Sequence, residues 1–169
     1  MLSVQYIKKV IKISLIFLLS VIILRMFVIE PGKVDGRSME TYLIDNDKFL
    51  VDKFSLLFRA PKRGDIVQFI DTESQDLFIK RIVGLPGEII KIEKNLIFII
   101  DEQGREIELP EPYLTRDTIT KAPETGFREY PKLAPYNYFM LGDHREESKD
   151  SRHFGPIHRS MITGKVIKL

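Results

Sequence analysis

The feature that most constrains this chain is a single strongly apolar segment near its N-terminus, Val10–Ile29. Sixteen of its twenty residues are apolar, and the exceptions are Lys12, Ser14, Ser20 and Arg25. No polar face is visible along it, which argues against a helix packed in a soluble core. A removable leader would need small residues at a cleavage site after the apolar run, and none follows at suitable spacing. The segment therefore predicts a retained transmembrane anchor over residues 10–29.

The length of this segment sets a condition on how it crosses a bilayer. Its uncharged stretch, Ile13–Leu24, has twelve residues. As a helix that stretch rises roughly 18 Å, against a hydrocarbon core of ~30 Å. A span therefore requires Lys12 and Arg25 to extend their charged groups toward opposite headgroup layers, while Met26–Ile29 lengthens the apolar run.

Charge is unevenly distributed along the chain. The formal net charge is only +2, yet the first twelve residues hold Lys8, Lys9 and Lys12 and no acid. Basic residues on the N-terminal flank of an apolar segment favour a cytoplasmic N-terminus. We therefore expect residues 1–9 in the cytoplasm and residues 30–169 as one extracytoplasmic domain. The small net charge gives no basis for nucleic-acid binding, and the absence of cysteine excludes a disulfide framework and a thiolate nucleophile.

Beyond the apolar segment, the chain has the pattern of a mainly β domain. Short runs rich in β-branched and aromatic residues, separated by turn signals, predict strands at residues 48–54, 65–70, 77–83, 88–93, 96–100 and 136–141. Pro31-Gly32 predicts the end of the apolar helix, and the proline-rich stretch 110–132 predicts a long loop. No long amphipathic helix is expected after residue 30.

Several nucleophile and metal patterns can be tested directly. The stretch Gly36-Arg37-Ser38-Met39-Glu40 lacks the second glycine of a nucleophile elbow, and no serine is followed three residues later by lysine. Asp143 and His144 leave a Ser-His-Asp triad open on composition. The three histidines, at 144, 153 and 158, do not form a helical ligand pair with a glutamate between them, so no metal is expected.

Lys80 lies within a predicted strand, where alternation places Phe78, Lys80 and Ile82 on one face. Burial among apolar neighbours would disfavour the ammonium form and lower the pKa of the lysine. A neutral amine can then accept a proton from a serine hydroxyl. From alternation alone, however, a lysine extending into solvent from a half-exposed strand is the better interpretation.

Three blocks, taken in order, change that interpretation because they resemble the type I signal peptidases. The residues that carry the resemblance are Gly36–Met39 for the nucleophile block, Arg63–Val67 for a connecting strand, Lys80–Glu88 for the lysine block, and Gly142–Arg145 with Ser148, Asp150–Arg152 and Gly155 for the C-terminal block. Their order and spacing match over nearly the whole chain. Any one block alone would be a weak signal, whereas the ordered set is highly specific.

The resemblance implies a mainly β fold behind a transmembrane helix, and a membrane-bound serine endopeptidase that removes signal peptides from exported precursors. Ser38 is the implied nucleophile, Lys80 the general base and Ser148 the hydroxyl that orients the lysine amine. Asp143, Arg145, Asp150 and Arg152 are implied to support the site by charge pairing. The backbone N–H of Ser38, with Gly36 as a second candidate, is the expected oxyanion hole.

The same resemblance implies the partners. They are precursor proteins that carry signal peptides, with small side chains just before the cut, together with the lipid of the cell membrane. Neither a metal nor an organic cofactor is implied, and nucleic acid is not an expected partner.

The chain departs from the family pattern at two places. Thr41-Tyr42 stands where the family usually has Pro-Thr, and His144 stands where asparagine is common. A proline would fix φ after the nucleophile, so its loss favours an altered substrate preference or weak activity. Two alternatives stay open: a specialised peptidase for few substrates, and a membrane-anchored protein that binds signal peptides without cutting them. The apolar cluster Phe54–Arg59 predicts either contact with the membrane surface or an ordinary strand end in the core.

Overall fold

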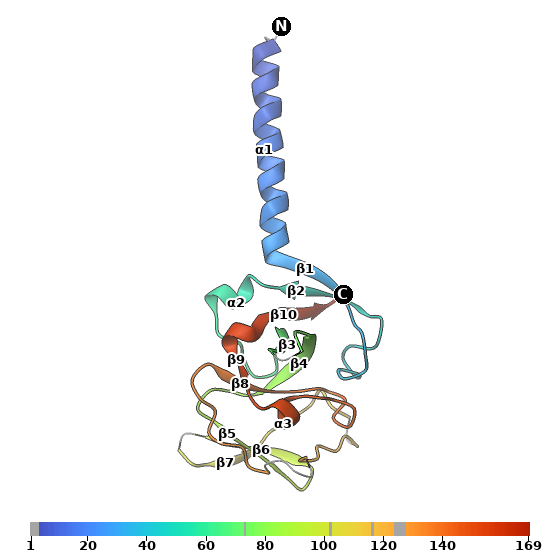
Figure 1. Cartoon of the computed structure of the whole chain (residues 1–169), viewed down its shortest axis with the longest axis vertical. Helices are drawn as coiled ribbons and strands as arrows, with labels where there is room; N and C mark the ends of the chain where they lie inside the picture. Colours follow the sequence, from blue (N-terminus) through green and yellow to red (C-terminus); the bar gives the residue numbers. More distant parts are fainter. Residues whose placement is uncertain (1–3, 73, 102, 116, 124–127) are drawn as a thin grey trace.

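A computed structural model describes residues 4–72, 74–101, 103–115, 117–123 and 128–169 of the chain. A long helix, α1 (Val4–Val28), projects from a β-rich body that holds the rest of the protein (Figure 1). The predicted helix is therefore present, but it begins at Val4 rather than Val10. The helix ends at Val28, just before Pro31-Gly32 as predicted, and these two residues lie in strand β1 (Ile29–Lys33). Proline is tolerated there because β1 is an edge strand.

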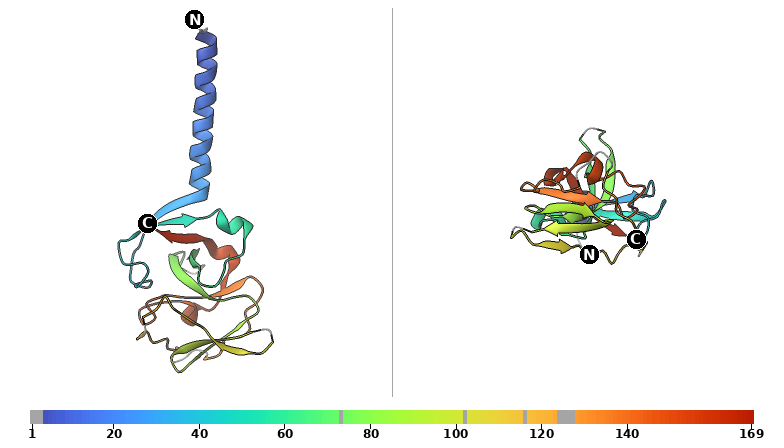
Figure 2. Two further views of the ribbon diagram at one scale, coloured as in Figure 1. Left: turned by 180° about the vertical axis from the view of Figure 1, so that it is seen from behind. Right: turned by 90° about the horizontal axis from the view of Figure 1, so that it is seen from below.

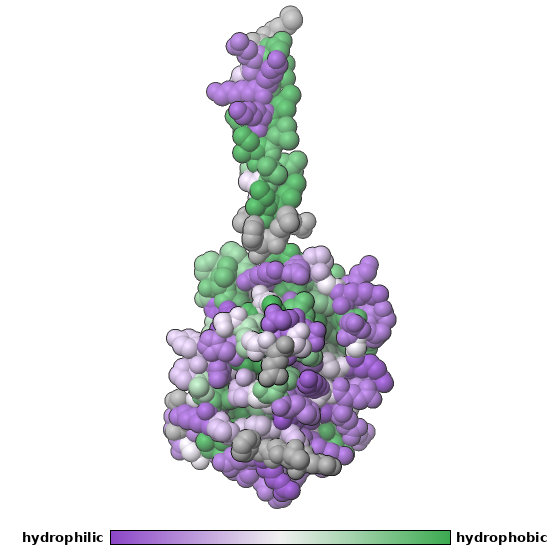
Figure 3. Space-filling view, viewed as in Figure 1, coloured by the Kyte–Doolittle hydropathy of each residue, from purple (hydrophilic) through white to green (hydrophobic). Residues whose placement is uncertain are grey.

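The surface of α1 is apolar over much of its length (Figure 3). Leu15, Phe17, Leu18 and Leu19 are all exposed, since no other element packs against them. Within the described part of the chain, no helix combines the length and the apolar character needed to cross a membrane. The side chains of residues 24–27 lie outside the described residues, so the expected reach of Arg25 toward a headgroup layer stays a prediction.

The body contains two antiparallel sheets. The larger has the strand order β1-β2-β10-β3-β4-β8-β9, and the smaller has the order β5-β6-β7. The strands after β1 are β2 (Lys48–Asp52), β3 (Ile66–Ile70), β4 (Leu77–Gly84), β5 (Ile89–Glu93), β6 (Leu96–Ile100), β7 (Glu106–Glu108), β8 (Asn137–Leu141), β9 (Ile157–His158) and β10 (Ile162–Lys168). The smaller sheet lies at the end of the body far from α1, as both side views show (Figures 1 and 2).

The six predicted strands are confirmed as β2, β3, β4, β5, β6 and β8, with ends that differ by one or two residues. The predicted strand at 48–54 stops at Asp52 because the carboxylate of Asp52 accepts a hydrogen bond from the Ser55 backbone N–H (2.9 Å) and starts a short helix, α2 (Ser55–Phe58). The described residues of 110–132 form no helix or strand, as predicted. The helices after residue 30 are short: α2, α3 (Ser151–Phe154) and a 3-10 turn (Arg159–Met161).

Four strands were not expected from the sequence, and β10 is the most consequential of them. It lies between β2 and β3 in the middle of the larger sheet, so it joins the N-terminal strands to the rest. Its interior glycine, Gly164, weakens the strand signal. The structure explains that glycine, because a Cβ at this position would lie 2.4 Å from a methyl of Val51 on the neighbouring strand.

The centre of the larger sheet is covered on both faces. On β4, Ile82 belongs to one buried cluster and Val83 to another, and on β8, Met140 and Phe139 divide in the same way. Strands covered on both faces have no solvent side to which a polar residue can point. A charged side chain in the second half of β4 is therefore buried, and Lys80 is the first residue of that buried part.

Candidate active site

Ser38 is held in a tight turn that follows β1. The turn is closed by a hydrogen bond from the Leu43 N–H to the Met39 carbonyl (2.9 Å), and the side chains of Met39 and Leu43 are buried in the core. From the opposite side, the backbone N–H of His144 donates to the Ser38 carbonyl (3.1 Å). The nucleophile candidate is therefore fixed between two anchored loops, with a half-buried side chain.

Lys80 faces this serine from β4. Its ammonium nitrogen lies 2.7 Å from Ser38 Oγ, and its side chain is 2% exposed. Burial lowers the pKa of Lys80 from 10.5 to about 8, against an opposing pull from the carboxylates of Asp150 and Asp143. The interpretation of Lys80 as a solvent-exposed lysine on a half-exposed strand is therefore wrong, because alternation cannot reveal that both faces of β4 are covered.

Ser148 lies close to the backbone of Ser38 but does not make the hydrogen bond to Lys80 that was expected. Its hydroxyl is buried and has no hydrogen-bond partner among the residues that the structure describes. A Cβ placed on Gly142 would lie 2.2 Å from Ser148 Oγ and 2.4 Å from the Ser38 carbonyl oxygen. Only a glycine at position 142 lets the two serine-bearing segments approach this closely.

Asp143 forms a buried, bidentate ion pair with Arg81. Arg81 donates to its two carboxylate oxygens at 2.8 and 2.6 Å, and the Asp143 side chain is fully enclosed. The Arg81 guanidinium also stacks on the ring of Tyr113, 4.0 Å from its centroid, with Tyr42 at 5.6 Å. Arg81 was not among the residues singled out from the sequence, although it directly follows Lys80 and points to the opposite face of β4.

Arg145 is also buried, and its partner comes from the long loop. Its guanidinium donates to both carboxylate oxygens of Glu111, and its Nε donates to the Gly142 carbonyl (3.0 Å). Arg145 is therefore a buried charge with a fixed partner. Glu111 was missed because nothing in the sequence marks one glutamate of a proline-rich loop as the partner of a distant arginine.

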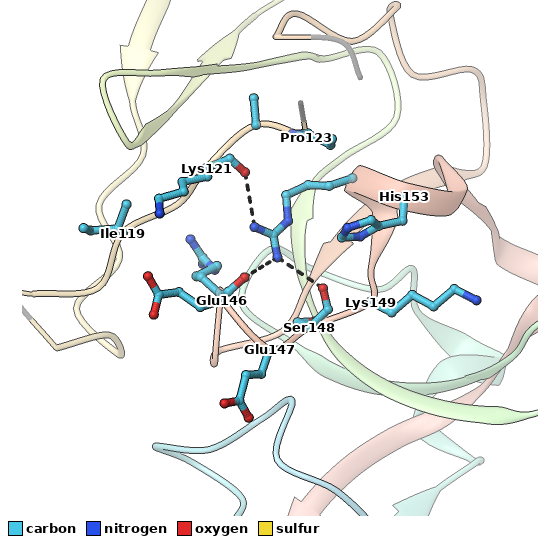
Figure 4. Close-up of a pocket in the computed structure, with 11 residues that line it drawn as sticks. Ile119, Lys121, Pro123, Glu146, Glu147, Ser148, Lys149 and His153 are labelled. Atoms are coloured by element: carbon cyan, nitrogen blue, oxygen red, sulfur yellow. Dashed lines mark hydrogen bonds between the residues drawn. The ribbon is translucent and has the colours of Figure 1, made fainter. Parts of the chain in front are cut away.

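Asp150 and Arg152 form the third buried pair. Arg152 donates to the two Asp150 oxygens, both at 2.8 Å, and Asp150 also accepts the Gly142 N–H (3.1 Å). The remaining donors of Arg152 reach the backbone carbonyls of Arg145, Ser148 and Lys121. Figure 4 shows these bonds converging between the segments that carry Lys121 and Ser148. The three pairs together tie the loop after β8 to β4 and to the long loop.

His144 does not complete a Ser-His-Asp triad. Its ring nitrogen Nδ1 lies 3.3 Å from Glu40 and 3.9 Å from Glu147, and these carboxylates are also shared with Arg37. The side-chain partner of the Ser38 hydroxyl is Lys80. The geometry therefore favours the lysine over the histidine as the group beside the nucleophile.

The two backbone donors expected for the oxyanion hole differ in availability. Gly36 donates its N–H to Asp45 Oδ1 (3.0 Å), so this group is already engaged and the Gly36 expectation is not supported. The N–H of Ser38 has no acceptor among the described residues. In the described ranges, no three acidic or histidine side chains gather in a way that could hold a metal ion.

The turn after Ser38 has a backbone that proline cannot adopt. Thr41 has a φ of 109°, whereas proline is fixed near −65°. The next residue, Tyr42, is held by Lys168 of β10, which donates to its carbonyl (2.9 Å). The departure at Thr41-Tyr42 is therefore a real change of turn geometry and not a neutral replacement.

A cavity of about 280 Å³ opens beside Ser38. It is lined by residues of β1, β2, β3 and β4 and of the segment between β1 and β2 that carries Ser38. The side chains facing it from β2, β3 and β4 are Phe49, Val51, Gln68, Leu77 and Ile79. A small cavity with apolar side chains from β2 and β4, next to a serine hydroxyl, is suited to short side chains of a bound peptide.

A serine hydroxyl hydrogen-bonded to a desolvated lysine, beside such a cavity, is the arrangement of a serine hydrolase that uses an amine as its base. The chain belongs to the signal peptidase family: the family described as "Signal peptidase, peptidase S26" matches residues 7–168. Membership makes the protein a serine endopeptidase of the kind that removes signal peptides.

Individual relatives agree with this assignment. The chain is 38% identical over 141 residues to "Signal peptidase I V" of Bacillus subtilis (strain 168), covering 79% of this chain and 81% of the relative. It is 32% identical over 147 residues to "Signal peptidase I P" of Bacillus subtilis subsp. natto, covering 84% and 76%. It also resembles the crystal structure of a signal peptidase I from Enterococcus faecalis V583, with a TM-score of 0.50, 27% identity, and coverage of 63% of this chain and 97% of that one.

Proposed function

We propose that this protein is a membrane-bound type I signal peptidase in which Ser38 is the nucleophile and Lys80 the general base. The observation that carries the proposal is the 2.7 Å contact between Lys80 Nζ and Ser38 Oγ, made by a lysine that is 2% exposed. With a pKa near 8, a useful fraction of Lys80 is neutral at physiological pH and can accept the serine proton.

The reaction proceeds in two stages. Ser38 Oγ attacks the carbonyl at the cleavage site while its proton moves to Lys80, and the Ser38 N–H stabilises the oxyanion. Lys80 then gives the proton to the leaving amine, which frees the mature protein. In the second stage, Lys80 takes a proton from a water molecule that attacks the ester on Ser38, and it returns this proton to Ser38 Oγ as the signal peptide leaves with a free C-terminal carboxylate.

The buried charges around the dyad have supporting roles in this proposal. The Asp143–Arg81 and Asp150–Arg152 pairs hold the loop whose His144 N–H fixes the Ser38 carbonyl. Their carboxylates also oppose the fall in the pKa of Lys80 caused by burial. Arg145 braces the same loop from Glu111. Ser148, with a buried hydroxyl that has no partner among the described residues, orients the Lys80 amine once substrate excludes water.

Membrane attachment is assigned to α1, with residues 1–9 in the cytoplasm and the catalytic domain of residues 30–169 outside. The exposed apolar side chains of α1 and the lysines near its start support this orientation. A second apolar surface lies on the body over α2, where Phe54, Leu57 and Phe58 are 48%, 74% and 76% exposed (Figure 3). Leu56 of the same segment is buried in the core, so the segment divides between core packing and a surface suited to lipid.

The proposal is tested by cleavage of a precursor with small residues at the first and third positions before the cut, in detergent. Ser38→Ala and Lys80→Ala should abolish cleavage, while His144→Ala retains it. Lys80→Arg should also be inactive, because arginine keeps the positive charge but cannot act as a base. Lys132→Ala, at an exposed lysine, is the matched control.

The pH profile adds an independent readout. Because Lys80 must be neutral, kcat/KM should rise with pH and level off above about 8, the pKa that burial gives this lysine. Activity that depends on Ser38 and His144 but survives Lys80→Ala would replace the dyad with a conventional triad. If the wild type cuts no precursor across a varied panel, that result would instead favour a protein that binds signal peptides without cutting them.

A further inference from the structure

Among the residues of β2, β3 and β4 that line the cavity beside Ser38, one has a polar side chain. Gln68 stands on β3 among Phe49, Val51, Leu77 and Ile79, and it is only 6% exposed. A buried glutamine in an apolar wall is costly unless its amide is hydrogen-bonded, because its donors and acceptor have lost water. Both the Oε1 and the Nε2 end of the Gln68 amide therefore need a hydrogen-bond partner.

One end of the amide is satisfied within the protein. Thr163 Oγ1, on the neighbouring strand β10, donates to Gln68 Oε1 (2.8 Å). The Gln68 Nε2 group has no hydrogen-bond acceptor among the residues that the structure describes. Thr163 thus holds one end of the amide and leaves the other available to whatever occupies the cavity.

The position of Gln68 indicates which side chain of a bound peptide it meets. In an extended peptide, the first and third residues before the cut point to the same side, roughly 6.6 Å apart. The first must lie at Ser38, which is bonded to Lys80 on β4. Gln68 is one strand further from that contact, on β3, and is held toward β10. The third residue therefore reaches the amide.

We infer that Gln68 is a specificity-determining residue that favours a hydroxyl side chain, serine or threonine, at the third position before the cut. The oxygen of such a hydroxyl accepts a hydrogen bond from the Gln68 Nε2 group, the end of the amide that Thr163 leaves available. An apolar side chain of the same shape leaves that end unpaired. The inference rests on the proposed peptidase function and deepens it by naming the class of residue that this cavity selects.

The test compares precursors that are identical except for threonine, valine or alanine at the third position, cleaved by the full-length protein in detergent. Threonine and valine have nearly the same shape, so their ratio of kcat/KM isolates the hydroxyl. Wild type should cleave the threonine precursor about fivefold more efficiently than the valine one, as expected for one hydrogen bond. Gln68→Met, of similar length without an amide, should bring the ratio close to one. Gln103→Met, at an exposed glutamine in the turn between β6 and β7, should leave it unchanged.

The alanine precursor separates the possible failures. A wild type that cleaves it but does not distinguish threonine from valine overturns this inference alone, as does a ratio unaffected by Gln68→Met. A wild type that cleaves none of the precursors overturns the proposed function and this inference with it. If Gln68→Met does not fold, Thr163→Val provides the test, because releasing the amide should lower the ratio, and an unchanged ratio would contradict the inference.

Discussion

The loop behind Ser38 and the small sheet of β5, β6 and β7 use charged residues in opposite ways. Behind Ser38, the pairs made by Asp143, Arg145 and Asp150 are almost completely enclosed. On the small sheet, Lys91 pairs with Glu93 and Glu106 at a surface where the acids are largely exposed. A buried charge that loses its partner stays desolvated, whereas an exposed one returns to water. The same residue types therefore hold the structure together in the loop behind Ser38 and contribute little to stability on the small sheet.

The largest effect on stability should come from Asp143→Ala. It leaves the Arg81 guanidinium buried beside β4 without a counter-charge, which typically costs about 3–5 kcal/mol. Urea unfolding in detergent measures this loss. The double variant Arg81→Met with Asp143→Leu should be less destabilised than Asp143→Ala, because it leaves no unpaired charge. A double variant that is more destabilised would show that the pair contributes more than charge compensation.

Lys80→Met should stabilise the protein although it abolishes cleavage. A folded-state pKa of about 8, below the unfolded value of 10.5, means that the folded protein holds the Lys80 proton less tightly. The resulting penalty of about 3 kcal/mol is fully present below pH 8. It is relieved as pH rises from 8 to 10.5, so the free energy of unfolding of the wild type should increase across that window.

The measurement is the pH dependence of urea unfolding. Lys80→Met should be more stable than wild type at pH 7 and should lack the increase between pH 8 and 10.5. Equal stabilities at pH 7 would mean that the buried lysine is not desolvated in the way the structure indicates.

Thr41→Pro should have an intermediate effect. It restores the residue usual in the family but demands a φ near −65° where the turn has 109°. We expect a loss of about 1–3 kcal/mol together with slower cleavage. Thr41→Gly, which tolerates positive φ, should leave the unfolding midpoint unchanged or raise it slightly. A Thr41→Pro variant as stable as wild type would show that this turn readily adopts the usual family conformation.

The smallest effect should come from Glu106→Ala on the small sheet. Lys91 keeps Glu93 as a partner at 2.9 Å and remains accessible to water. The unfolding midpoint and the rate of cleavage should both stay within experimental error of wild type. A clear loss of stability would remove the contrast between the two regions from which these predictions start.

The strands that could be predicted from sequence are those with uninterrupted apolar or alternating runs, such as β3 and β6. Two of the four missed strands contain residues that weaken the pattern: Pro31 and Gly32 in β1, and Gly164 in β10. Their reasons are tertiary, since β1 lies at a sheet edge and Gly164 packs against Val51. Neither of these tertiary causes can be recognised from a local sequence pattern.

The candidate site divides in a similar way. Ser38 and Lys80 could be found because family blocks surround them, and the structure brings them into contact. Arg81 and Glu111 could not, because each acts through a partner distant in sequence. Gln68 looks like an ordinary polar residue of a strand until the cavity beside Ser38 is known. Burial, which decides the pKa of Lys80, likewise depends on both faces of β4 being covered.

The central place of β10 in the larger sheet has a consequence for biosynthesis. This strand follows all the others in the chain, yet it pairs with β2 on one side and β3 on the other. Until it arrives, the segment carrying Ser38 and the strand carrying Lys80 belong to two separate pieces of sheet. Pairing between segments so distant in sequence forms late in folding. We therefore expect the protein to cleave nothing while its chain is still being made, because Ser38 and Lys80 come together only after β10 has paired with β2 and β3.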